Sequence, residues 1–261
     1  MRVRGMLTVL AVLLLTATIP DAAGAVTPAN TPTAESVPGI ADVGPLFDNG
    51  LTNDHGCTAS ILQSPQHDLI LTAGHCVSGT GAGLLFAPGY DDGHTPYGVW
   101  TTTAAYVDPS WIGSQDPQHD YAILRLATQV WHGRTVGVQQ VTGGGNVIVP
   151  APRAGKKLTV PAYPAGINDR PIDCAVTVYK TDGYPSFDCA GYFGGTSGAP
   201  WLIRVGNLSL VAGVIGGLHQ GGCVDFTSYS SAFSTDTYRL WLRAALRLPA
   251  DTVPAAGSDG C

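Results

Sequence analysis

Short apolar segments separated by glycine-rich turns constrain this chain more than any other feature of its sequence. Runs such as LILTAG, YAILRLA and CAVTVYKT are rich in β-branched or aromatic residues, and most runs are shorter than a typical helix. Glycine supplies 34 of the 261 residues and lies mostly between these runs. Because glycine between short strands is typical of tight hairpin turns, the pattern predicts an all-β fold of antiparallel strands.

One helix is predicted, at residues 234–248, near the C-terminus. Ser234 or Thr235 can cap its first turn, and Pro249 ends it. Its apolar face is predicted from residues spaced at i, i+3, i+4 and i+7, which are Tyr238, Trp241, Leu242 and Ala245. Residues 249–261 are predicted to form an unstructured tail unless Cys261 holds them in place.

The N-terminus has the pattern of a secretory signal peptide, residues 1–25. Arg2 and Arg4 precede an apolar run too short to span a membrane, and small residues ending at Ala25 form a cleavage site. Residues 26–39, rich in Pro, Ala and Thr, are predicted to be an extended leader or propeptide. We therefore expect a secreted, extracellular protein.

Net charge limits the partners of the mature chain. The signal peptide contains two of the 13 basic residues and one of the 19 acidic residues, which leaves 11 basic against 18 acidic. Such a chain has no basic surface to recruit nucleic acid or an anionic membrane. We expect a monomer that acts on a protein or peptide, without nucleic acid and without membrane attachment after signal cleavage.

Six cysteines in an exported chain predict disulfides, and six cysteines allow fifteen pairings. Cys57 and Cys76 enclose one segment, and Cys174 and Cys189 enclose a second. Cys223 with Cys261 is the remainder, and Cys189 with Cys223 is an alternative. Because the chain has no Cys-x-x-Cys pair and no His-Glu-x-x-His run, we expect neither a metal nor another cofactor.

Three segments carry side chains suited to acyl transfer, in the order His, Asp, Ser. His75 follows an apolar run in LILTAGHCV, Asp120 precedes one in QHDYAILRL, and Ser197 lies among glycines in GGTSGAP. Acyl transfer needs a nucleophilic hydroxyl, an imidazole that takes its proton and a carboxylate that orients the imidazole. Glycine also permits the backbone angles that point two N–H groups at one oxyanion. We therefore predict oxyanion donors at Gly195 and Ser197.

These residues also have other interpretations. A serine among glycines is more often part of a tight turn than a nucleophile, and Asp108 and Asp116 are alternatives to Asp120. The nucleophile motif of α/β-hydrolases fits poorly, because Ala199 replaces its last glycine and because its histidine comes last, whereas no histidine follows His219. The occurrence of all three residue types in the order His, Asp, Ser favours a catalytic triad.

The motifs TAGHC, HDYAIL and GTSGAP resemble those of the chymotrypsin-fold serine peptidases, the trypsin superfamily. The segments VGPLF, CTAS, TAGHCV, APGY, PYGVW, GGTSGAPWL, VIGG and SYS are similar to the bacterial branch that includes secreted actinobacterial trypsin-like peptidases and V8-like glutamyl endopeptidases. The resemblance covers residues 40–248. It implies two antiparallel six-stranded β-barrels of the chymotrypsin type, a site in the cleft between them, and a C-terminal helix packed on the second barrel.

Matched position by position, the resemblance implies a general base at His75, its orienting carboxylate at Asp120 and a nucleophile at Ser197. It also matches Gly195 and Ser197 to the oxyanion donors, and residues 214–219 to the strand that pairs with the substrate backbone. The implied substrate-binding residues are Gly191, Tyr192, Ile215, Gly216, Gly217 and Leu218. The first barrel is expected over residues 40–135 and the second over residues 136–233.

Two positions depart from the family pattern. Thr196 replaces the aspartate that captures a new N-terminus in zymogens, so that switch is expected to be absent. Gly191 stands where trypsin-like enzymes carry an acidic residue, so the resemblance does not imply cleavage after Lys or Arg. Ile215 stands at the position of the histidine that V8-like enzymes use to select Glu, although His219 lies near it in sequence.

Two functions from different classes follow. The first is a secreted serine endopeptidase that hydrolyses peptide bonds through an acyl-enzyme. The alternative is a catalytically silent protein of the same fold that acts as a binding module. Silent relatives lose a triad residue, and this chain keeps His75, Asp120 and Ser197.

Overall fold

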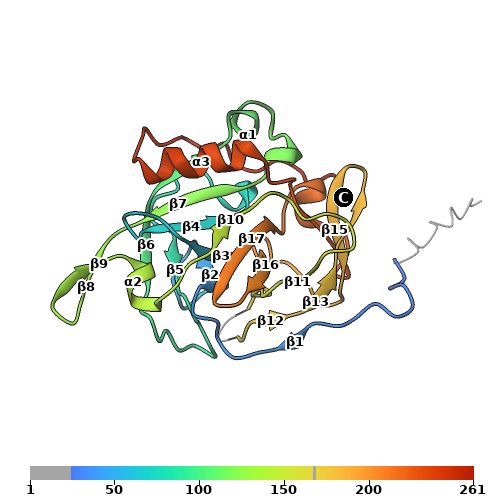
Figure 1. Cartoon of the computed structure of the whole chain (residues 1–261), viewed down its shortest axis with the longest axis horizontal. Coiled ribbons are helices and arrows are strands. Elements are labelled where there is room, and N and C mark those ends of the chain that lie inside the picture. The colour runs from blue at the N-terminus through green and yellow to red at the C-terminus, as the bar shows by residue number, and fades with distance from the viewer. Residues whose placement is uncertain (1–24, 167–168) are drawn as a thin grey trace, which may run out of the picture.

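The computed structural model describes residues 25–166 and 169–261, so the predicted signal peptide lies outside the described residues except for Ala25. The predicted all-β fold with a helix near the C-terminus is confirmed (Figure 1). None of the helices in the described ranges is long and apolar enough to cross a membrane.

Six antiparallel strands of the first half close into a barrel, in the order β2-β3-β4-β7-β6-β5. Its strands are β2 (Val43–Phe47), β3 (Cys57–Leu62), β4 (Leu69–Thr72), β5 (Leu85–Phe86), β6 (Trp100–Val107) and β7 (Ala122–Leu126). Every residue of β3 and β4 is buried, because one face of each strand lines the barrel and the other is covered by the rest of the molecule. This explains why LILT begins as a continuous apolar run and why Thr58 and Ser60 of β3 are buried although they are polar.

The second half forms a five-stranded and a three-stranded sheet, rather than one closed hydrogen-bonded ring among the described residues. The first has the order β10 (Val147–Ile148), β17 (Leu208–Val214), β16 (Pro200–Val205), β11 (Lys157–Thr159), β13 (Ala175–Thr177). The second has the order β14 (Tyr179–Thr181), β15 (Tyr184–Asp188), β18 (Thr227–Tyr229). Only Val178 separates β13 from β14, so the chain changes sheets there.

The remaining elements are short and lie at the edges of these sheets. The hairpin β8–β9 extends from the side of the first barrel in Figure 1, and the predicted boundary between the barrels falls within β9. The elements are β1 (Glu35–Ser36), β8 (Gln129–Trp131), β9 (Arg134–Val136), β12 (Ile172–Asp173), α1 (Pro109–Ser114), α2 (Val138–Thr142), α3 (Thr235–Ala245) and the 3-10 turns η1 (Gly74–Cys76), η2 (Pro117–His119) and η3 (Leu218–Gly221).

The C-terminal helix α3 corrects three expectations. It ends at Ala245, three residues before the predicted end. Its main packing partners are β6 and β7 of the first barrel rather than the strands of the second (Figure 1). Of the predicted face, Ala245 is buried and Trp241 is half-buried, whereas Tyr238 and Leu242 are 53% and 40% exposed. Thr237, Leu240 and Ala244 are buried as well, so the covered stripe is rotated partly away from the predicted one, because the barrel surface decides which residues are covered.

The predicted leader is bound to the second half of the molecule. Glu35 and Ser36 form β1, which pairs antiparallel with β12 along the outer edge of the fold (Figure 1). Ala34 N–H donates to Ala190 O at 2.9 Å, and Val37 N–H donates to Pro171 O at 2.9 Å. Residues 33–37 thus add backbone hydrogen bonds to the second half and do not form a separate extended segment.

We predict that removing residues 26–39 destabilises the protein. A chain that begins at Ile40 loses the β1–β12 pairing and the bonds around it, each contributing roughly 1 kcal/mol net, so the free energy of unfolding should fall by about 2–4 kcal/mol. Urea unfolding measures this change. A chain that begins at Thr31 is the control, because residues 26–30 are exposed. Equal midpoints for the chains beginning at Val26 and Ile40 would contradict the prediction.

Candidate active site

Asp120 and His75 form the centre of the site. Asp120 follows η2 at the entry to β7, and its side chain is fully buried. Its Oδ2 accepts a hydrogen bond from His75 Nδ1 at 2.8 Å, and its Oδ1 accepts from the His75 backbone N–H at 2.8 Å. The carboxylate therefore fixes both the backbone and the ring of His75. With the proton on Nδ1, the ring leaves Nε2 as a proton acceptor.

A third donor reaches Asp120 from the other half of the molecule. The Gly217 backbone N–H donates to Asp120 Oδ2 at 2.8 Å. Glycines also lie on either side of the carboxyl group: a Cβ on Gly74 would approach Oδ1 to 3.1 Å, and a Cβ on Gly216 would approach Oδ2 to 3.1 Å. Both distances are tighter than ordinary van der Waals contact, so larger residues at either position would crowd the carboxylate.

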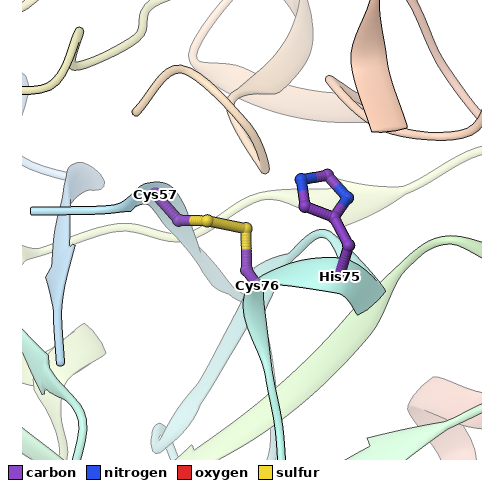
Figure 2. A group of neighbouring side chains, drawn as sticks. All are labelled: Cys57, His75 and Cys76. Carbon is purple, nitrogen blue, oxygen red and sulfur yellow. A yellow bond between two sulfur atoms is a disulfide. The ribbon is translucent and has the colours of Figure 1, made fainter. Parts of the chain in front are cut away.

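A disulfide lies beside His75. Cys57 and Cys76 are bonded, and Figure 2 shows the His75 ring standing beside the bridge. The bridge ties the start of β3 to η1, which carries His75. The Cys174–Cys189 and Cys223–Cys261 bonds are also formed.

Two clusters of the described residues bring three metal-ligand atoms within 4.8 Å of one another. These are Cys57, His75 and Cys76 (Figure 2), and His219, Cys223 and Cys261. Zinc is held by thiolates, and the cysteines of both clusters are joined as disulfides. Each cluster therefore offers only its histidine as an ordinary ligand.

Ser197 is anchored to the first barrel through Thr58. Thr58 N–H donates to Ser197 O at 2.7 Å, and the Thr58 hydroxyl donates to Gly195 O at 3.0 Å. Because Thr58 follows Cys57 and Cys57 is bonded to Cys76, the serine loop and the His75 turn share one support. No motif of the sequence indicates this role of Thr58, and its one local signal is its place beside Cys57.

The glycines beside Ser197 are required by the backbone. Gly195 has φ +92°, and a Cβ there would lie 2.3 Å from Ala165 N. Gly198 has φ +81°, and a Cβ there would lie 2.2 Å from Thr72 Oγ1. Among the described residues, the N–H groups of Gly195 and Ser197 donate to no protein acceptor. Both predicted oxyanion donors are therefore available to a ligand.

The Ser197 hydroxyl and His75 Nε2 are not joined by a hydrogen bond in the described part of the chain. Such bonds are often long in ligand-free enzymes and shorten in the complex with substrate. The two alternative acids have other roles: Asp108 caps α1 by accepting from Ser110 N–H, and Asp116 caps η2 by accepting from Gln118 N–H. Asp120 is thus the acid that contacts His75.

Ser197 borders a pocket with a volume of about 270 Å³. Of the six predicted substrate-binding residues, Tyr192 and Ile215 line it. The other four are Gly191, Gly216, Gly217 and Leu218, which lie beside the pocket lining in the chain but are not part of it. Another part of the wall was not predicted from the sequence and consists of the segment Gly221 to Asp225 and Ser228.

The hydroxyl groups of Tyr192 and Thr196 both donate hydrogen bonds to backbone carbonyls of the protein. The Tyr192 hydroxyl donates to Val160 O at 2.5 Å, and burial raises the pKa of Tyr192 well above its usual range. The Thr196 hydroxyl donates to Phe193 O at 2.7 Å within the same turn. Thr196 therefore stabilises the loop locally at the position where zymogens carry aspartate.

The C-terminal tail reaches the rim of the pocket. Gln220 lines the pocket and donates from Nε2 to Gly257 O at 2.9 Å, while His219 Nδ1 lies 3.0 Å from Asp259 O. The Cys223–Cys261 disulfide joins the end of the tail to the pocket wall. His219 thus contacts the tail and is not part of the pocket lining.

We predict that Gly198→Ala destabilises the fold by about 2–5 kcal/mol, from left-handed strain together with overpacking against Thr72. Gly206→Ala is the matched control, because Gly206 has φ +58° but open space around its Cβ position. That control should lose only about 1–2 kcal/mol. Thermal unfolding of both variants measures the difference, and equal losses would show that the contact with Thr72 is unimportant.

Solved serine proteases have the same fold as this chain. The thermostable serine protease AL20 from an extremophilic microorganism is 25% identical, with a TM-score of 0.67 over 79% of this chain and 97% of that one. Protease Anisep from Arthrobacter nicotinovorans is 25% identical, with a TM-score of 0.69 over 82% and 100%. A Glu endopeptidase is 18% identical, with a TM-score of 0.60 over 82% and 98%, a likeness of fold alone.

Sequence comparison adds one curated relative, and no family model matches the chain. The relative is named an extracellular metalloprotease of Bacillus subtilis (strain 168), and it is 31% identical over 90 residues. The match covers 33% of this chain and 27% of that protein, so the chain spans about a quarter of its length. The two-part β fold, the order of His75, Asp120 and Ser197, and the likeness to AL20 and Anisep agree: the chain has the fold of the chymotrypsin-type serine peptidases.

Proposed function

We propose that the protein is a secreted serine endopeptidase that cleaves peptide bonds through a Ser-His-Asp acyl-enzyme. The observation that supports it most is the bond from His75 Nδ1 to the buried carboxylate of Asp120. This bond holds the imidazole in the tautomer that accepts a proton at Nε2 and stabilises the imidazolium that follows.

The reaction proceeds in two halves. His75 Nε2 takes the proton of the Ser197 hydroxyl as Oγ attacks the peptide carbonyl carbon, and the N–H groups of Gly195 and Ser197 stabilise the oxyanion. The imidazolium gives its proton to the leaving amine, which leaves an ester on Ser197. Water then attacks the ester, with His75 again as base, and releases the acid.

Secretion is proposed from three features. Residues 1–25 have the pattern of a signal peptide. All six cysteines are paired in disulfides, which persist in oxidising compartments and are rare in the cytosol. The curated relative is also named as extracellular. We further propose that residues 26–39 are a leader or propeptide that is held on the second half through β1 until it is removed after export.

The alternative of a silent binding module has less support. It predicts loss of a triad side chain or a blocked oxyanion site. This chain has His75 paired with Asp120, and the N–H groups of Gly195 and Ser197 are free of protein acceptors in the described ranges. These features favour catalysis.

We predict that Ser197→Ala abolishes labelling by a fluorophosphonate probe and lowers kcat by a factor of about 10⁶, because the nucleophile is lost. Asp120→Asn should lower kcat by a factor of about 10⁴, because the amide favours the wrong histidine tautomer. Probe labelling and peptide hydrolysis measure both changes. Ser78→Ala, at an exposed serine, is the control and should behave as wild type. A wild-type protein that neither labels nor hydrolyses peptides would instead support the binding module.

We predict that breaking the Cys223–Cys261 bridge with the double variant Cys223→Ser/Cys261→Ser raises KM more than it lowers kcat. The tail then no longer restrains the pocket wall, whereas His75 and Asp120 are untouched. Loss of the bridge should also lower the free energy of unfolding by about 2–4 kcal/mol. Steady-state kinetics and urea unfolding measure these effects, with Ser258→Ala as a tail control that keeps the bridge. A fall in kcat with unchanged KM would contradict this role of the tail.

A further inference from the structure

The pocket beside Ser197 contains a single charged side chain. Its lining combines glycine backbone, the rings of Tyr192 and Phe193, and neutral polar groups such as Gln220 and Ser228. Asp225 is the one acidic residue of the lining, and Cys223 is held in a disulfide. The lining includes no Lys, Arg or His.

Asp225 is held in place by the backbone on both sides of the pocket wall. Its carbonyl oxygen accepts from Gly191 N–H at 3.0 Å and from Tyr192 N–H at 2.9 Å. Two residues earlier, Cys223 is bonded to Cys261. The next residue, Phe226, accepts from Cys189 N–H at 3.0 Å. The segment is therefore fixed relative to the chain that leads to Ser197.

The Asp225 carboxylate has no protein partner in the described part of the chain. It forms no hydrogen bond and no ion pair there, unlike Asp120, Asp68 and Asp251. Asp225 is half-buried. A half-buried anion without a partner is satisfied by water in the free protein and favours a cationic ligand group in a complex.

On the basis of the proposed function, we propose that Asp225 selects substrates with lysine or arginine on the N-terminal side of the cleaved bond. The ammonium or guanidinium group pairs with the Asp225 carboxylate, and Tyr192 and Phe193 flank the aliphatic stem. An acidic substrate side chain in this pocket is repelled by the Asp225 carboxylate. A large neutral side chain displaces water from the carboxylate and offers it no hydrogen bond in return.

The family resemblance did not imply this preference, because Gly191 stands where trypsin-like enzymes carry an acidic residue. The Gly191 N–H is bonded to the Asp225 carbonyl, so the acidic residue adjoins the same part of the pocket from a different segment of the chain. A segment distant in sequence, held to Gly191 by this hydrogen bond, thus supplies the negative charge that the motif around Ser197 lacks.

The test compares peptides that differ only at this side chain: arginine against citrulline, lysine against norleucine, and glutamate. Citrulline keeps the shape of arginine without its charge. The wild type should show at least a tenfold higher kcat/KM for arginine than for citrulline. Asp225→Asn should reduce that ratio by roughly 10- to 100-fold, as expected for the loss of a charge-assisted hydrogen bond. Asp225→Glu, which keeps the charge, should retain most of the preference.

Asp182→Asn is the matched control, because it removes the same charge from an exposed turn and should leave the ratio unchanged. Detectable fluorophosphonate labelling of Asp225→Asn shows that Ser197 still reacts in this variant. If the wild type labels and cleaves but does not distinguish arginine from citrulline, or if Asp225→Asn keeps the preference, the assignment of Asp225 is wrong and the proposed function stands. If the wild type neither labels nor cleaves, both fail.

Discussion

The structure depends on one buried carboxylate. Asp120 is fully enclosed and accepts hydrogen bonds from the backbone and ring of His75 in the first half and from the backbone of Gly217 in the second. An ionised group removed from water is destabilising by several kcal/mol unless such donors surround it. The same three bonds orient His75 and join the two halves of the molecule. Folding and the geometry of the candidate site therefore depend on one set of contacts.

Close backbone contact is the second constraint on the site. Thr58 donates hydrogen bonds to the carbonyl oxygens of Gly195 and Ser197. The Thr72 side chain leaves no space for a Cβ on Gly198. Positive φ at Gly195 and Gly198 shapes the turn that carries Ser197. The glycines that mark hairpin turns elsewhere therefore have a different role here, which is to let the serine loop lie against the first barrel.

Both ends of the described chain are tied to the fold by contacts with distant segments. Residues 33–37 add a strand beside β12, and the tail pairs with Gly79 and Ala105 of the first half and is bonded to the pocket wall through Cys261. The two segments have the polar, proline-rich composition of disordered chain. They are ordered by non-local backbone hydrogen bonds and a disulfide, which composition does not reveal. The wall that includes Asp225 thereby has support from residues distant in sequence.

The sequence alone determined the fold class, because strand length and glycine spacing are local properties. It also predicted a pair of residues, His75 and Asp120, that the structure brings into contact, because motif order reflects the chemistry of acyl transfer. Only the tertiary structure decided which stripe of α3 is buried and that Thr58 supports Ser197. It also placed Asp225 in the pocket. These features arise from contacts between distant segments, and no local pattern records such contacts.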